Sequence, residues 1–113
     1  MADVVLINVE EGSKRVMNNA KLYAKLLTKF KDDPNMKNIE DAFEAGDMEK
    51  AHVAAHTLKG VASNLSLVEL AAKTLELETE IKNKSVNPDM LAVLKSTHEL
   101  TLTEIDKVIA QYA

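Results

Sequence analysis

The residues best suited to chemistry lie together in the stretch AAHTLKGVASNLS, residues 54–66. His56 is followed at i+3 by Lys59 and at i+4 by Gly60, so the three would share one side of a helix. A neutral imidazole is a nucleophile, an ammonium can neutralise an anion, and a glycine leaves open space beside the ring. Glycine inside a helix costs about 1 kcal/mol relative to alanine, so this one calls for an explanation.

A helical wheel at about 100° per residue places His56 about 160° from Leu58, and therefore on the solvent face. An exposed histidine is most often only solvated surface, and a lone helix glycine is weak evidence. Together with Lys59, however, they favour a histidine that accepts a phosphoryl group. The helix dipole would disfavour the resulting phosphate anion by about 0.3–1 kcal/mol, and a hydrogen bond from Lys59 would offset that cost by about 1.5–3 kcal/mol. The opposite, apolar stripe is formed by Ala51, Ala54, Ala55, Leu58, Ala62 and Leu65.

Turn signals divide the rest of the chain into helical segments that must position this stretch. An Asn-Asn pair at 18–19 ends a first short helix, from about Val9 to Met17, and offers an N-cap for the next. Pro34 breaks residues 19–45 into two helices or one bent helix.

Gly46 and Asp47 supply a C-cap and an N-cap, so the segment with the histidine should run from Met48 to about Ser63. The spacing of Ser66–Glu69 is that of a capping box, which predicts a helix to about Lys84.

Asn87 and Pro88 then start a long final helix, as N-cap and first helical residue. Several helices joined by short turns predict an all-α fold, an antiparallel four-helix bundle with a short N-terminal covering helix, with residues 1–113 as a single domain.

Composition limits the possible partners and location. The chain has 113 residues, 14 Lys and Arg against 18 Asp and Glu, and a net charge of -4, which argues against nucleic acid or an anionic membrane as partner. It has no cysteine, no apparent signal peptide and no membrane-length apolar run. We therefore expect a cytoplasmic protein.

The stretch AHTLKGVASNLS resembles the signature of histidine-containing phosphotransfer (HPt) domains, His-x-x-Lys-Gly on the second long helix of a four-helix bundle. The likeness extends over residues 10–84, where VEEGSKRVMNNAKLYAKLLTKF, AGD and LAAKTLELE look like the family's N-terminal region, interhelix turn and neighbouring helix. The resemblance implies that His56 accepts the phosphoryl group, Lys59 is its charge partner and Gly60 gives access. It also implies that Glu78, on the inward stripe of the next helix, is the hydrogen-bond partner of the imidazole.

The resemblance further implies a phosphocarrier in a multistep two-component phosphorelay. Its partners would be response-regulator receiver domains, which supply Mg²⁺, and a hybrid histidine kinase. The chain itself would need no cofactor, would act as a monomer and would have no ATP-dependent kinase activity, since no nucleotide motif is present. The expected docking face consists of His52, Val61, Ser63 and Leu67. Serines at 63 and 66 replace the family's usual glycines, and Val61 replaces a smaller residue, which affects the choice of partner.

Other interpretations stay open. A helical module that binds receiver domains without being phosphorylated is the main alternative. His52 and His56 at i, i+4 could bind a metal, but the sequence offers no third ligand, so we expect no metal site. His98 is expected to be a hydrogen-bonded core histidine, and four methionines, Met17, Met36, Met48 and Met90, are expected to fill gaps in the core.

Overall fold

The computed structural model describes residues 5–112, and within that range the regular structure is entirely helical. The all-α prediction is therefore confirmed. The six helices are α1 (Val9–Lys14), α2 (Ala20–Phe30), α3 (Asn35–Ala45), α4 (Met48–Asn64), α5 (Val68–Lys82) and α6 (Met90–Tyr112).

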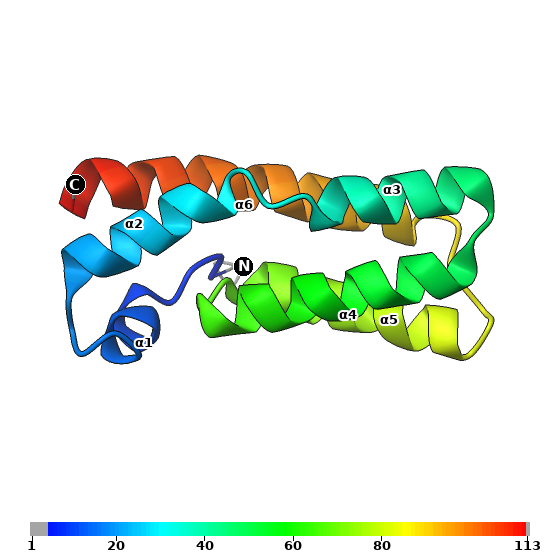
Figure 1. Ribbon diagram of the computed structural model, residues 1–113, viewed down its shortest axis with the longest axis horizontal. Coiled ribbons are helices and arrows are strands. Elements are labelled where there is room, and N and C mark those ends of the chain that lie inside the picture. The colour runs from blue at the N-terminus through cyan, green and yellow to red at the C-terminus, as the bar shows by residue number, and fades with distance from the viewer. Residues whose placement is uncertain (1–4, 113) are drawn as a thin grey trace.

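Helices α2 and α3 lie end to end and together form one side of an elongated molecule (Figure 1). Helix α4 returns beside α3, α5 runs back beside α4, and α6 returns along α5 and α2, so neighbours are antiparallel. Helix α1 lies at one end, beside α2 and the turn between α4 and α5. This arrangement is compatible with the predicted bundle and its short covering helix.

The turn chemistry explains where several helices begin and end. Asn19 caps α2 through its side chain, 3.0 Å from Leu22 N, as predicted. Residues 19–45 form two helices, because α2 ends at Phe30 and Pro34 stands at the start of α3. Gly46 ends α3 with φ 71°, a left-handed conformation that glycine adopts without a Cβ clash. Asp47 Oδ1 accepts from Lys50 N at 3.0 Å, which completes the predicted restart.

The core is built mainly from aliphatic side chains on the inward faces of five helices. The small residues of the predicted stripe on α4 let α5 and α3 pack closely against it, and Leu58 is fully buried between them. The buried side chains include Tyr23, Leu27, Phe30, Ile39, Ala51, Ala55, Leu58, Ala62, Leu67, Leu70, Leu77, Leu94 and Ile105.

The first helix is shorter than predicted. It ends at Lys14, because Met17 and Asn18 adopt left-handed conformations with φ 57° and 60°. Met17 is consequently 92% exposed and fills no gap in the core, and Met48 is also exposed. Met36 and Met90 are buried as predicted.

The predicted capping box at Ser66–Glu69 is wrong. Ser66 has φ 57° and ends α4, since Leu67 N donates to Ala62 O at 2.9 Å in the manner of a Schellman turn. Its hydroxyl bonds Glu11 at 2.9 Å, so it cannot cap α5, which begins only at Val68.

Helix α6, the next helix after α5, begins at Met90, two residues later than predicted. Asn87 still makes a local cap, because its Oδ1 accepts from Asp89 N at 2.9 Å. Over residues 5–112 no helix combines the length and apolar character that crossing a bilayer requires.

Candidate functional site

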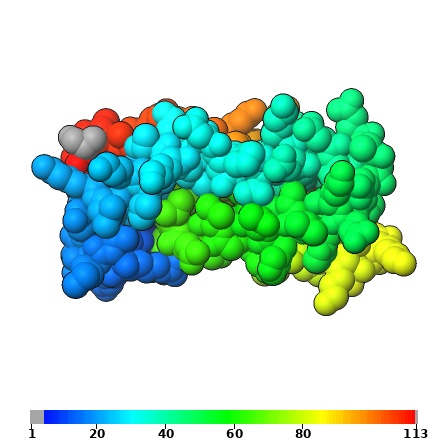
Figure 2. Space-filling view, viewed as in Figure 1, coloured from blue at the N-terminus to red at the C-terminus, as the bar shows by residue number. Residues whose placement is uncertain are grey.

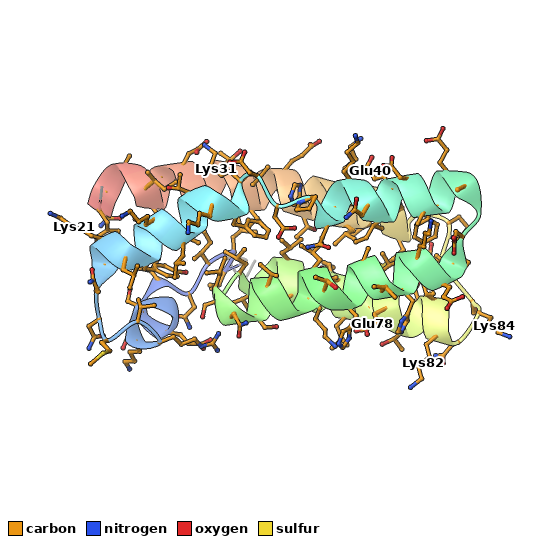
Figure 3. All side chains as sticks on the ribbon, viewed as in Figure 1. Lys21, Lys31, Glu40, Glu78, Lys82 and Lys84 are labelled. Carbon is orange, nitrogen blue, oxygen red and sulfur yellow. The ribbon has the colours of Figure 1, made fainter. Side chains whose placement is uncertain are left out.

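His56 stands on the exposed side of α4, above the line where α4 and α5 pack together. Its side chain is 65% exposed, and its Nδ1 lies 2.7 Å from Oε2 of Glu78 on α5. Figure 3 shows Glu78 where α4 and α5 lie side by side. An ionised carboxylate only accepts hydrogen bonds, so Nδ1 carries the proton and the lone pair is on Nε2.

Lys59 reaches the same carboxylate from one turn further along α4. Its Nζ lies 2.8 Å from Glu78 Oε1, while His56 occupies Oε2. The carboxylate therefore bridges the imidazole and the ammonium, and all three predicted polar site residues come together. In this arrangement the ammonium pairs with Glu78, so it must swing toward Nε2 to contact an anion there.

Glu78 is buried, with only 12% of its side chain exposed. Burial by itself raises the pKa of a carboxyl group, because the charged form loses solvation. The hydrogen bonds from Lys59 and His56, together with the positive charge of Lys59, outweigh this effect and hold the pKa of Glu78 below its ordinary value of 4.5. The carboxylate is therefore ionised near neutral pH and can keep the proton on Nδ1 of His56.

His52 adds a second imidazole to the site. Its ring lies nearly parallel to that of His56, with centroids 6.5 Å apart and an interplanar angle of 11°. His52 Nε2 lies 3.7 Å from Glu78 Oε2, which is too far for a hydrogen bond. The two rings and Glu78 line an open groove together with Leu75, Thr79 and Lys82.

Gly60 leaves the opposite side of the His56 ring free. A Cβ built on Gly60 would meet no atom within 4 Å other than those of its two chain neighbours and the adjacent backbone of α4, so the glycine relieves no clash with another part of the described structure. The His56 ring is thus flanked by an imidazole one turn toward the N-terminus and by open space one turn toward the C-terminus. A partner could approach through that space.

The residues expected to form the docking face do not all lie on it. His52, which is partly exposed, and Ser63, which is exposed, lie on the same side of α4 as His56. Val61 is half-buried and packs against the core. Leu67 is fully buried and cannot contact a partner, because the left-handed turn at Ser66 directs it into the core.

Sequence reasoning missed two exposed apolar side chains near the site. Val53 on α4 is 61% exposed and Leu75 on α5 is 49% exposed. The wheel that placed His56 also places Val53 about 60° from it, so this residue could have been found. Leu75 could be found only once the packing of α5 on α4 was known.

Two other predictions concern the remaining histidine and metals. His98 is half-buried, with its ring edge-on to Phe30 at 6.1 Å, and makes no hydrogen bond among the residues described, so the predicted bond is wrong. Burial lowers its pKa below 6.5, against the opposing effect of nearby acidic groups. Between residues 5 and 112, no three His, Cys, Asp or Glu side chains form a group that could hold a metal ion.

Comparison with known proteins gives one match. The family model of the Hpt domain matches residues 25–111, most of the chain. The match includes α6, beyond the residues 10–84 that carried the resemblance, and begins inside α2, after α1. Searches of curated proteins and of solved structures found no match. With its helical fold and the His56–Glu78 pair, the chain belongs to the Hpt domain family, whose members transfer phosphoryl groups through a histidine in phosphorelays.

Proposed function

We propose that this protein is a phosphocarrier in which Nε2 of His56 accepts a phosphoryl group from an aspartate of a receiver domain and passes it to another receiver. The observation that carries the proposal is the 2.7 Å contact between Glu78 Oε2 and Nδ1 of a ring that is 65% exposed. This contact fixes the tautomer with a nucleophilic Nε2 and leaves that nitrogen accessible.

In the transfer step, a bond forms between His56 Nε2 and phosphorus while the bond from phosphorus to the aspartyl oxygen breaks. The electron pair of that broken bond stays on the aspartate carboxylate. The proton on His56 Nδ1 remains in place, and Glu78 stabilises the positive charge that develops on the ring. The reverse step regenerates the neutral imidazole, so the site can pass the group on without an external acid or base.

Lys59 and Gly60 assist in different ways. A phosphoryl group on Nε2 adds a charge of about -1.5 to -2 on the exposed face of α4, by analogy with other phosphorylated side chains. Lys59 can swing from Glu78 toward that charge, because its side chain is partly exposed. Gly60 leaves room for the acidic, Mg²⁺-containing pocket of the receiver to close over the ring.

The source of the phosphoryl group must be another protein, because the sequence has no nucleotide-binding motif. We assign a hybrid histidine kinase upstream and a response regulator downstream. We further propose that the carrier acts as a monomer, and that it acts in the cytoplasm, in keeping with the absence of cysteine from the sequence.

The test is incubation with a radiolabelled, phosphorylated receiver domain and Mg²⁺, using wild type, His56→Gln and His52→Gln. His52→Gln is the matched control, because it removes the same ring one turn away on the same helix. We expect acid-labile label on wild type and on His52→Gln, and none on His56→Gln. Binding of the receiver without any label would instead support the non-phosphorylated interaction module.

A further inference from the structure

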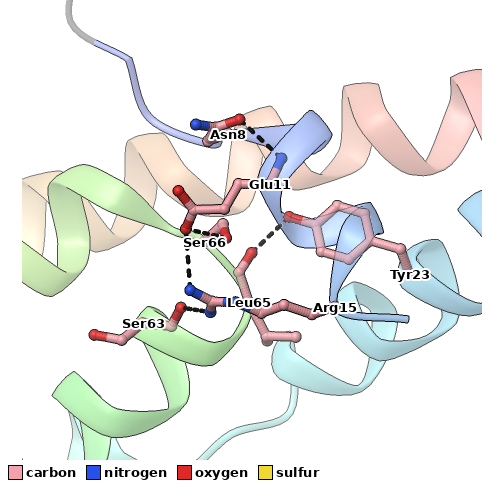
Figure 4. Close-up of polar contacts among 7 residues, drawn as sticks. All are labelled: Asn8, Glu11, Arg15, Tyr23, Ser63, Leu65 and Ser66. Atoms are coloured by element: carbon pink, nitrogen blue, oxygen red, sulfur yellow. Dashed lines mark hydrogen bonds and ion pairs between the residues drawn. The ribbon is translucent and has the colours of Figure 1, made fainter. Parts of the chain in front are cut away.

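Helix α1 lies outside the family match, yet it is tied to the end of the helix that carries His56. Figure 2 shows the atoms of α1 against the C-terminal end of α4. Figure 4 shows Glu11, Arg15 and Tyr23 in contact with the end of α4 and the turn that follows it. The backbone N–H of Asn8 also donates to Ser66 O, at 2.9 Å. We call this set the α1 clamp; it consists of Asn8, Glu11, Arg15, Tyr23, Ser63, Leu65 and Ser66.

The α1 clamp supplies side-chain donors to two carbonyl groups at the C-terminal end of α4: Ser63 O, which also accepts from Ser66 N at 3.1 Å, and Leu65 O. The guanidinium of Arg15 donates to Ser63 O, and the hydroxyl of Tyr23 donates to Leu65 O at 2.5 Å. Burial raises the pKa of Tyr23 to about 12, so its hydroxyl stays protonated as a donor. Glu11 Oε1 accepts from both Arg15, at 3.1 Å, and Ser66, at 2.9 Å. The guanidinium is thus held in a defined place.

The guanidinium of Arg15 lies beside the face on which a receiver must dock. Ser63 is seven residues after His56, so the two lie about 10 Å apart along the axis of α4. They project on nearly the same side of the helix, with Gly60 between them. A standard interface covers about 800 Å² per partner, a patch of about 16 Å radius. A receiver centred on His56 would therefore extend over Arg15.

Arg15 also has unused binding capacity. A guanidinium carries five N–H donors, and the two bonds described use one on Nη1 and one on Nη2. The side chain remains 45% exposed. A carboxylate could bind the free donors without breaking the contact to Ser63, and arginine favours carboxylates because of its planar fork.

We propose that Arg15 is a specificity-determining residue for docking, which binds a carboxylate on the rim of the receiver's acidic phosphorylation pocket. The inference rests on the proposed function, in which the receiver approaches His56. It assigns to Arg15, the C-cap residue of α1 and outside the family match, a direct part in the choice of partner. Lys59 serves the transferred group itself, whereas Arg15 contacts the body of the partner.

The experiment measures transfer from the receiver domain that labels wild type fastest, phosphorylated with acetyl phosphate and Mg²⁺. Arg15→Gln should raise KM about threefold to tenfold with kcat unchanged, because a charged contact at the rim mainly affects association. Arg15→Glu should raise KM further, and Arg15→Lys should restore part of the loss. The differences in KM between these variants and wild type should become smaller at about 1 M salt, where the screening length falls to about 3 Å.

Two controls separate docking from damage to the site. Lys14→Gln removes an equal charge from α1, where Lys14 pairs only with Glu10 at 3.4 Å among the described residues, and should leave KM unchanged. Phosphoramidate, a small phosphoryl donor, should label His56 equally fast in wild type and Arg15→Gln. Unchanged KM in both Arg15→Gln and Arg15→Glu, or an equal rise in Lys14→Gln, would overturn the inference while leaving the carrier intact. A wild type that no receiver and no phosphoramidate can label would overturn the proposed function, and this inference with it.

Discussion

Gly60→Ala should make the protein more stable and a poorer phosphocarrier at the same time. Gly60 lies within α4, its φ is not positive, and an added Cβ would meet no atom within 4 Å beyond its chain neighbours and the adjacent helix backbone. Alanine should therefore gain the full difference in helix propensity, about 1 kcal/mol. For 113 residues the entropy of unfolding is about 2.1 cal/mol/K per residue, so this gain corresponds to a rise in Tm of about 4 °C.

Phosphoryl transfer, in contrast, should become slower, because the alanine methyl group partly fills the open space beside His56. Forcing a methyl group into a packed interface costs about 1–3 kcal/mol, which slows transfer from a receiver by roughly fivefold to 150-fold. Gly60→Gln, whose side chain is longer, should slow it more. The assays are thermal unfolding and single-turnover transfer from a phosphorylated receiver, with phosphoramidate labelling as a check that the His56 ring stays reactive.

Gly12→Ala provides the contrasting control. A Cβ at Gly12 would lie 2.5 Å from the ring of Tyr23, so this substitution should lower Tm, in contrast to Gly60→Ala. If Gly60→Ala lowers Tm, the structural account of this glycine is wrong. If both Gly60 variants are stable and transfer at the rate of wild type, the open space has no role in docking.

Three further predictions concern stability. Glu78→Gln should lower the free energy of unfolding by about 1.5 kcal/mol near neutral pH, through the lost ion pair with Lys59 and the weaker hydrogen bond that a neutral amide accepts from His56. The folded-state pKa of Glu78 lies below 4.5. The difference in unfolding free energy between wild type and Glu78→Gln, measured by urea unfolding, should therefore shrink as pH falls from 4.5 through that lower value. His98 has a folded-state pKa below 6.5, so wild type should lose stability as pH falls from 6.5 through that lower value, and His98→Leu should not show this loss in the same titration. Ser66→Gly should be more stable than Ser66→Ala by about 1 kcal/mol in thermal unfolding, since both lose the bond to Glu11 but only alanine keeps the strain at φ 57°. Equal stability of the two would show that the left-handed conformation is not strained.

Much of the fold follows from local chemistry. Asn19, Gly46 and Asp47 satisfy backbone groups within three or four residues of themselves, so their roles can be predicted from neighbouring letters alone. Ser66 could not be interpreted in that way. The spacing Ser-x-x-Glu is that of a capping box, but the hydroxyl bonds Glu11, 55 residues away in sequence, and the backbone turns left-handed to close α4. Tertiary contacts decided that position, and the burial of Leu67 followed.

The site, like the fold, has some features that the local sequence predicts and others that depend on tertiary contacts. The exposure of His56 and the open space at Gly60 are properties of one helix and were predictable from its periodicity. The wheel alone placed His56 outward and Glu78 inward, and only the packing of α5 on α4 determines that they meet. The resting contact of Lys59 with Glu78, and the position of Arg15 beside Ser63, also depend on that packing and on the turn after α4. No local pattern in the sequence indicates them.

The most direct test of the central claim is to identify which imidazole nitrogen becomes phosphorylated. The chain would be labelled with ¹⁵N at histidine, phosphorylated by a receiver domain, and examined by long-range ¹H–¹⁵N NMR. The hydrogen bond from Nδ1 to Glu78 predicts phosphorus on Nε2 of His56, with Nδ1 still protonated and the signals of His52 and His98 lacking any phosphorus coupling. Phosphorus on Nδ1 of His56, or on His52, would contradict the account.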